Sequence, residues 1–289
     1  MEKAIFNEKL LKLVSDALKE DIGDGDHSTL SCIPSTQYGR GVLKIKEAGI
    51  LAGVAVAKQI FEIIEPGTNF ILHKQDGETM QPGETAFEVE ASVHTLLKAE
   101  RLVLNTMQRM SGIATLTRSF VDKIEGYHSR LLDTRKTTPN FRLLEKEAVK
   151  IGGAINHRFG LYDMIMLKDN HIDYCGGIVK AIEKAYAYVQ TVKPGLKIEV
   201  ETRSLEDVQM AIDSGKVDRI MLDNFSPAQI VKALELLDGR CETEASGGIN
   251  FDSILEYAAT GVDYISVGGL IHQARSLDLS LKAVLDLTF

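Results

Sequence analysis

The 289-residue sequence predicts an α/β protein whose carboxyl-terminal part is a β/α barrel. After residue 128 the chain repeats an apolar strand, a polar turn and a helical pattern six times, which indicates parallel strands joined by crossover helices. Each strand ends in a residue that can contact a ligand, as expected where a barrel builds its active site. The residues before 128 follow a different pattern. The predicted strands are 131–133, 164–168, 198–201, 220–223, 243–246 and 264–268.

The strand ends favour a barrel over an open, doubly wound sheet. An open sheet concentrates its ligand contacts in one crevice, whereas a barrel places them at the carboxyl end of every strand. Periodicity alone does not exclude the open sheet. The residues at the six ends are Asp133, Lys168, Glu201, Asp223, Ser246 and Gly268.

The amino-terminal part predicts a smaller α+β unit. Residues 6–20 carry leucines at helical spacing and are followed by a loop rich in glycine and aspartate. Between residues 39 and 91, short β-branched runs alternate with Pro-Gly turns. A long helical pattern over 93–125 connects the two parts, and Ser111-Gly112 is a candidate break in it.

Composition excludes several classes of function. The formal charge of -8, from 41 acidic and 33 basic side chains, opposes binding to nucleic acid or anionic lipid. No apolar stretch approaches the ~20 residues that a membrane span needs. The three cysteines, Cys32, Cys175 and Cys241, have neither disulfide-framework nor zinc-site spacing, so we expect a reducing, cytoplasmic location.

Clustered cations predict an anion-binding site. Arg135 and Lys136 stand among threonines at a strand end before a helix, and Lys168 ends an apolar strand. His157-Arg158 adds further positive charge. An isolated basic turn is usually solvated, but recurrence at several strand ends of an acidic protein favours a site for phosphate or carboxylate.

Two carboxylates predict a magnesium site facing these cations. Glu201 and Asp223 each end a strand, and Mg²⁺ commonly uses one or two carboxylates together with substrate oxygens. Structural ion pairs with Lys136 and Lys168 are compatible with this role. Glu199 shares a strand face with Glu201, so the sequence leaves open which of them faces the site.

Glycine-rich loops predict a phosphate site. Ser246-Gly247-Gly248 and Gly268 follow the last two strands, where exposed backbone N–H groups commonly hold a phosphate in barrels. The sequence contains no P-loop, no nucleophile elbow and no His-Glu-x-x-His motif. We therefore expect neither P-loop nucleotide chemistry nor a serine nucleophile.

The chain contains DTRKTTP at 133–139, GGAINHRFGLYD at 152–163 and LKDNHI at 167–172. Together with the strand-end residues described above, these segments resemble the quinolinate phosphoribosyltransferase family. The resemblance covers nearly the whole chain, and the block from the first of these motifs to the third is highly specific. Asn140 and Ala154 stand where glycine is frequent in the family. The matching motifs are DTRKTTP at 133–139, GGAINHRFGLYD at 152–163, LKDNHI at 167–172, EVE at 199–201, LDNF at 222–225, SGGI at 246–249 and GVDYISVG at 261–268, with KEDIGDGDHST at 19–29 and AERLVLNTMQRMSGIAT at 99–115.

The resemblance implies an incomplete, seven-stranded β/α barrel beside an amino-terminal α/β sandwich. The domains would be 1–112 and 113–275, with the segment 276–289 packing back on the first domain. It also implies transfer of phosphoribose from phosphoribosyl pyrophosphate to the ring nitrogen of quinolinate, with decarboxylation to nicotinate mononucleotide in NAD biosynthesis. The expected assembly is a homodimer with shared active sites, and a hexamer remains open.

The resemblance also assigns residues to roles. Quinolinate would meet Arg135, His157, Arg158 and Lys168, together with Arg101 of a neighbouring subunit. Phosphoribosyl pyrophosphate would meet Thr134, Lys136, Glu201, Asp223, Ser246, Gly247, Gly248 and Gly268. Lys136, Lys168, Glu201 and Asp223 would be catalytic, and Glu201 and Asp223 would hold Mg²⁺ directly or through water.

Three alternatives stay open at this point. One is a related phosphoribosyltransferase acting on nicotinate or another small anion, including a molybdenum-transport-associated homologue. Another is a sugar-phosphate isomerase or aldolase that uses Lys168 as a base or Schiff-base amine. The third is a binding protein that returns its anion unchanged.

Overall fold

The computed structural model describes residues 3–284, which form two compact units. Within that range, the antiparallel-sheet unit comprises residues up to 118, residues 137–153 and residues from 270 onward. The parallel-sheet unit comprises residues 119–136 and 154–269. Among the described residues, no helix combines the length and the apolar character needed to cross a membrane.

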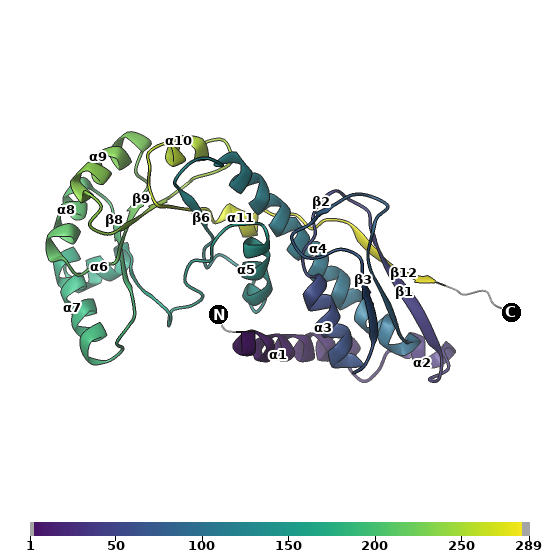
Figure 1. Ribbon diagram of the computed structural model, residues 1–289. Helices are drawn as coiled ribbons and strands as arrows, with labels where there is room; N and C mark the ends of the chain where they lie inside the picture. The colour runs from purple at the N-terminus through teal and green to yellow at the C-terminus, as the bar shows by residue number, and fades with distance from the viewer. Residues whose placement is uncertain (1–2, 285–289) are drawn as a thin grey trace. The chain divides into compact units, whose positions relative to one another are not determined.

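The antiparallel-sheet unit contains a four-stranded sheet in the order β12-β1-β5-β3 (Figure 1). Each neighbouring pair is antiparallel. The strands are β1 (Tyr38–Ile45), β3 (Asn69–Leu72), β5 (Thr85–Ser92) and β12 (Leu279–Val284), with a separate pair β2 (Gly49–Ile50) and β4 (Thr79–Met80). The helices are α1 (Lys3–Ile22), α2 (His27–Cys32), α3 (Val54–Ile64), most of α4 (Val93–Lys123), α5 (Arg142–Ile151) and most of α11 (Gly269–His272).

Aromatic packing joins α3 to this sheet. Phe70 and Phe87 lie on neighbouring strands with ring centroids 4.4 Å apart, and Phe61 of α3 lies 6.3 Å from each. The carboxyl-terminal strand β12 pairs with β1, so this end of the described chain adds an edge strand to the sheet. The remainder of the expected segment 276–289, from 285 onward, lies outside the described residues.

Helix α4 runs without interruption through Ser111 and Gly112, so the predicted break there was wrong. The two small residues let other backbone segments approach the helix. Ser111 Oγ accepts a hydrogen bond from Ala52 N at 3.0 Å. A Cβ added at Gly112 would lie 1.8 Å from the carbonyl oxygen of Arg275, a distance that no side chain tolerates.

The parallel-sheet unit contains six described strands in the order β6-β11-β10-β9-β8-β7, and every neighbouring pair is parallel (Figure 1). The six predicted strands and the α/β class are therefore confirmed. The strands are β6 (Arg130–Leu132), β7 (Ile165–Leu167), β8 (Ile198–Thr202), β9 (Arg219–Asp223), β10 (Glu242–Ser246) and β11 (Tyr264–Ser266). The helices between them are α6 (Asp169–Cys175), α7 (Ile178–Thr191), α8 (Leu205–Ser214), α9 (Pro227–Leu237) and α10 (Ile254–Ala258).

Period-two alternation separates apolar from charged residues on these strands. In β8, Ile198 and Val200 lie on the face of the sheet that packs against the neighbouring helices, while Glu199 and Glu201 lie on the opposite face. Register places Glu199 beside Arg219 and Glu201 beside Met221. One face of the sheet therefore carries layers of polar side chains that end at its carboxyl edge.

Candidate active site at the carboxyl edge of the parallel sheet

A pocket of about 860 Å³ lies at the carboxyl edge of the parallel sheet, and every residue that lines it belongs to the parallel-sheet unit. The strand ends expected to form a site are thus brought together. The lining includes these residues singled out from the sequence: Thr134, Arg135, Lys136, His157, Arg158, Lys168, Glu201, Asp223, Ser246, Gly247, Gly248 and Gly268.

Arg101 does not line this pocket. It lies on α4 in the antiparallel-sheet unit, where its side chain is exposed. Its expected contribution to a neighbouring subunit's site therefore stays a prediction.

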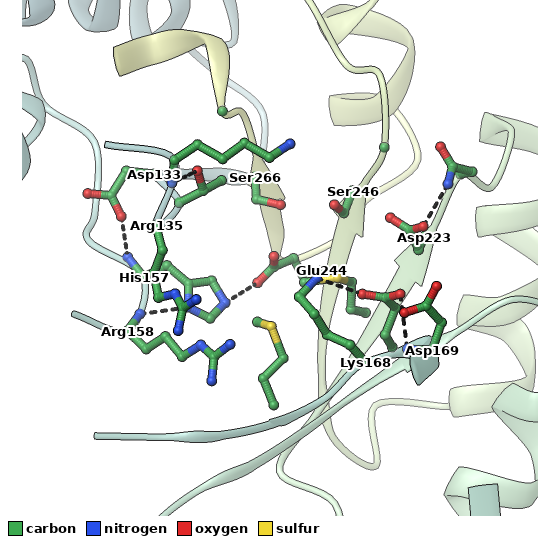
Figure 2. Close-up of a pocket in the computed structure, with 18 of the residues that line it drawn as sticks. Asp133, Arg135, His157, Arg158, Lys168, Asp169, Asp223, Glu244, Ser246 and Ser266 are labelled. Atoms are coloured by element: carbon green, nitrogen blue, oxygen red, sulfur yellow. Dashed lines mark hydrogen bonds and ion pairs between the residues drawn. The ribbon is translucent and has the colours of Figure 1, made fainter. Parts of the chain in front are cut away.

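The pocket has a cationic side formed by Arg135, His157 and Arg158 (Figure 2). Burial and the nearby charge of Arg135 both lower the pKa of Arg158. Arg158 Nη1 also donates to the carbonyl oxygen of Met164 at 3.3 Å. Because like charges converge here in a partly buried setting, an anion with several oxygens would be stabilised on this side.

The opposite side of the pocket carries Lys168 and Asp223 (Figure 2), and Glu201 lines the pocket beside Lys168. Lys168 Nζ pairs with Glu201 Oε2 at 2.9 Å. Asp223 Oδ2 accepts a hydrogen bond of 2.6 Å from Asn224 Nδ2. Burial and then the negative charge of Glu201 raise the pKa of Asp223. A divalent cation would relieve that repulsion, and the two carboxylates are of the kind Mg²⁺ accepts, so the donor set fits this ion.

The structure resolves which glutamate of β8 faces the pocket. Glu201 lines the pocket, whereas Glu199 is fully buried and does not line it. Glu199 Oε2 instead lies 2.9 Å from Nε2 of His157, and Glu244 Oε2 lies 3.2 Å from the same nitrogen. Burial disfavours a charged imidazole, but the hydrogen bonds to the two glutamates outweigh it and raise the pKa of His157 to about 9.

Several lining residues were missed in the sequence. Glu244 lies two residues before Ser246 and so shares its strand face, a period-two signal that could have identified it. Asn224 lies in the LDNF motif, and Asp169 and His171 lie in LKDNHI. The apolar lining residues carried no such signal. The residues concerned are Leu161, Met166, Asp169, His171, Met221, Asn224, Glu244, Ile249 and Ser266, whereas Asp133, which also lines the pocket, was expected from its strand end.

The loop after β10 is tightly constrained around Asn224 and Gly247. Asn224 adopts a left-handed φ of 58°, and its N–H donates to the carbonyl oxygen of Ser246 at 2.8 Å. A Cβ on Gly247, whose φ is 99°, would lie 2.3 Å from Asn224 Oδ1. Asn140, where the resemblance leads one to expect glycine, also has a left-handed φ, 62°, a conformation that asparagine tolerates.

We predict that Gly247→Ala weakens anion binding by displacing Asn224, which neighbours Asp223. Titration calorimetry with inorganic phosphate should show roughly a tenfold or greater loss of affinity, because the added Cβ would lie 2.7 Å from the backbone nitrogen of Asn224 and must displace it. Gly261→Ala is the matched control: its φ of 85° imposes similar backbone strain, but nothing lies within 4 Å of its Cβ position. Equal losses in both variants would show that strain alone matters.

Comparison with known proteins assigns a family. A family model described as the quinolinate phosphoribosyl transferase C-terminal domain matches residues 113–282, and the corresponding N-terminal domain model matches 26–111. A Bacillus subtilis protein named probable nicotinate-nucleotide pyrophosphorylase (carboxylating) is 43% identical over 277 residues, covering 96% of this chain and 94% of its own. A chloroplastic nicotinate-nucleotide pyrophosphorylase (carboxylating) from Oryza sativa subsp. japonica is 41% identical, covering 94% and 77%.

Solved structures agree with this assignment. NadC from Streptococcus pyogenes is 42% identical with a TM-score of 0.87, covering 94% of this chain and 96% of its own. The nicotinate-nucleotide pyrophosphorylase from Francisella tularensis is 37% identical with a TM-score of 0.87, covering 96% and 97%. The motifs, the domain models and these relatives agree along nearly the whole length, and the chain therefore belongs to the quinolinate phosphoribosyltransferase family.

Proposed function

We propose that this protein transfers the phosphoribosyl group of phosphoribosyl pyrophosphate to the ring nitrogen of quinolinate and releases carbon dioxide. The products are nicotinate mononucleotide, pyrophosphate and CO₂, a step of NAD biosynthesis. The observation that carries the proposal is one pocket with Arg135, His157 and Arg158 on one side and two carboxylates on the other. The names of the relatives, quinolinate phosphoribosyltransferase (decarboxylating) and nicotinate-nucleotide pyrophosphorylase, support the same reaction.

The fold we propose for the parallel-sheet unit is the incomplete, seven-stranded barrel. A parallel bridge between Leu132 and Ile155 supports it, since it places residue 155 next to β6 on the side opposite β11. The segment at 155 would then be the seventh strand. The barrel would stay open between this segment and β7.

The cationic side suits the two carboxylates of quinolinate. Arg135 and Arg158 offer planar guanidinium donors, and His157 adds a third positive charge. Lys168 would face the quinolinate ring from the opposite side of the pocket. Lys136, Thr134 and the backbone of Ser246, Gly247, Gly248 and Gly268 are placed to meet the phosphates.

The first step needs no general base, because the pyridine nitrogen already carries a free lone pair. That pair forms the bond to the anomeric carbon, and the bond from this carbon to pyrophosphate breaks with its electrons leaving on oxygen. Lys136 and Lys168 stabilise the charge that grows on pyrophosphate. Glu201 and Asp223 stabilise the positive charge that develops on the sugar.

The second step uses the charge created by the first. The ring nitrogen is now cationic, so the electrons of the bond to the adjacent carboxylate stay on the ring when CO₂ leaves, and that carbon then takes a proton. The cations that hold the carboxylates fix the ring in place during both steps. Arg135 and Arg158 therefore contribute orientation instead of proton transfer.

Glu201 and Asp223 are the residues we propose to hold Mg²⁺. When bound, the ion would neutralise pyrophosphate oxygens and so favour departure of that group. Lys168, already paired with Glu201 at 2.9 Å, would lie beside it.

The same ion pair argues against the aldolase alternative. A Schiff-base lysine must have its amine free to attack a carbonyl, whereas Lys168 Nζ is paired with Glu201 Oε2. We also propose a reducing, cytoplasmic location, because all three cysteines are free thiols.

The first test is the reaction itself. The purified protein should form nicotinate mononucleotide and CO₂ from quinolinate, phosphoribosyl pyrophosphate and Mg²⁺, with no product when nicotinate replaces quinolinate, since three cations suit two carboxylates. Mass spectrometry of the nucleotide and trapping of labelled CO₂ measure both products. Product from nicotinate alone would retain the transferase chemistry and reject the dicarboxylate site. For the aldolase alternative, borohydride trapping with a carbonyl substrate would reveal a Schiff base at Lys168.

Asp223→Asn tests the metal assignment. Loss of this carboxylate should raise the Mg²⁺ concentration needed for half-maximal rate by roughly tenfold or more, because one charged ligand is removed from a site that has few. Initial rates across a magnesium titration give this value. Asp213→Asn on α8 removes the same charge from an exposed position of the same unit and should leave the titration unchanged. An unshifted titration in Asp223→Asn removes Asp223 from the metal site.

We propose a homodimer in which Arg101 completes the partner's pocket, and leave a hexamer as the larger alternative. The exposure of Arg101, in a unit separate from the pocket, supports this arrangement. Arg101→Ala and Lys168→Ala should each be inactive. Mixed after subunit exchange, they should recover about a quarter of wild-type activity, because half of the dimers carry one intact site.

The control for this experiment mixes Arg135→Ala with Lys168→Ala. Both lesions lie in one pocket, so each mixed dimer keeps two damaged sites and no activity should return. Failure of the Arg101 mixture to recover would place Arg101 in its own subunit's site, whereas full activity of Arg101→Ala alone would place it outside both.

A further inference from the structure

An exposed leucine lines the polar pocket of the parallel-sheet unit. Leu161 is 75% exposed, whereas the other large apolar residues that line the pocket are each at most 8% exposed, namely Met166, Met221 and Ile249. Packing within the unit therefore accounts for those three residues and not for Leu161. A single exposed leucine on open surface is ordinary, but one that lines a pocket gains free energy when a ligand with an apolar surface covers it.

The loop that carries Leu161 is closed on itself. Asp163 Oδ2 accepts a hydrogen bond from Phe159 N at 2.6 Å, and Asp163 Oδ1 accepts one from Gly160 N at 2.8 Å. The ring of Tyr162 packs directly on the backbone of Gly160, where an added Cβ would lie 2.6 Å from Tyr162 Cε1. The backbone is thus held on both sides of Leu161, and the leucine is presented from a formed turn.

The same loop carries one of the cations of the pocket. It begins at Arg158, which lies on the cationic side (Figure 2) and donates from Nη1 to the carbonyl oxygen of Met164 at 3.3 Å, at the other end of the loop. An aromatic dicarboxylate has charged oxygens at its edge and two largely apolar faces. A loop that brings a guanidinium and a leucine to one pocket suits both parts of such a ligand.

We propose that Leu161 is a specificity-determining residue that covers one face of the quinolinate ring, and that Asp163 is the positioning residue that holds the loop in place. The inference rests on the proposed function, since it assigns a ring contact for that substrate. The cations bind the carboxylates of any dicarboxylate, whereas the leucine favours those on a ring. The pocket thereby distinguishes aromatic dicarboxylates from open-chain ones of the same charge.

Two probes separate the contribution of the ring from that of the carboxylates. Phthalate carries its carboxylates on adjacent carbons of a benzene ring, and maleate carries them on the two carbons of a double bond. Titration calorimetry should show that the wild type binds phthalate more tightly than maleate. Leu161→Ala should weaken phthalate binding about tenfold and leave maleate binding unchanged, because an apolar contact of one or two methylene groups is lost. Leu161→Met, which has a similar volume, should keep the wild-type ratio of the two affinities.

Asp163→Asn tests the positioning role. The amide has one oxygen, so one of the two backbone N–H groups loses its acceptor, and the preference for phthalate over maleate should fall roughly threefold. The substitution also removes a negative charge near Arg158, which affects the two dicarboxylates alike. The ratio of the two affinities therefore reports the loop and not the charge.

Leu236→Ala on α9 is the matched control. It makes the same truncation at an exposed leucine of the same unit that does not line the pocket, so both affinities should stay at the wild-type values. Sedimentation velocity should show the wild-type oligomeric state in Leu161→Ala. A changed oligomeric state with an unchanged affinity ratio would overturn the proposal and assign Leu161 to a subunit interface.

The binding measurement is independent of turnover. A wild type without preference for phthalate, or a Leu161→Ala variant that keeps the preference, overturns the inference even if the wild type converts quinolinate. Absence of nicotinate mononucleotide from wild-type protein would instead reject the proposed function. The effect of Leu161→Ala on the two probes would then still decide whether this leucine selects aromatic dicarboxylates.

Discussion

Burial of charge on one face of a parallel sheet is the constraint on which the rest of the structure depends. Helices α7 to α9 pack against an apolar face of the sheet. Because side chains alternate along a strand, every second residue of β8, β9 and β10 then points to the opposite face. That face carries Glu199, Glu201, Asp223 and Glu244. Carboxylates buried in this way must find positive partners or a ligand.

The sheet satisfies this constraint differently at two depths. In the deeper layer, His157 and Arg219 compensate Glu199 and Glu244, so the charges balance within the protein. At the carboxyl edge, Lys168 pairs with Glu201, while burial and the charge of Glu201 raise the pKa of Asp223. The deeper charges are thus paired within the protein, whereas the repelling carboxylates at the carboxyl edge can be stabilised by a bound cation. The pocket of this acidic protein therefore has a cationic side and a side that carries carboxylates.

Local backbone geometry places the remaining groups. Asn224 in the left-handed region directs its N–H to Ser246, and only glycine at 247 leaves room for its amide. In the other unit, Gly112 allows a carbonyl to approach α4 where a side chain would collide. The sequence suggested a helix break at Ser111-Gly112, because small residues often mark kinks. Close packing against the helix, a long-range effect, explains them instead.

The sequence by itself determined the α/β class, the six strands and most of the pocket, because strand ends, polar turns and the DTRKT and KDNH motifs are local patterns. It left Glu199 and Glu201 undistinguished, since both have the same residue type and strand face. Only the tertiary structure decided between them: depth along the strand places Glu201 at the edge and Glu199 beside His157. Glu244 and Arg219 were likewise missed, because pairing between buried charges depends on strand register, which joins residues distant in the chain.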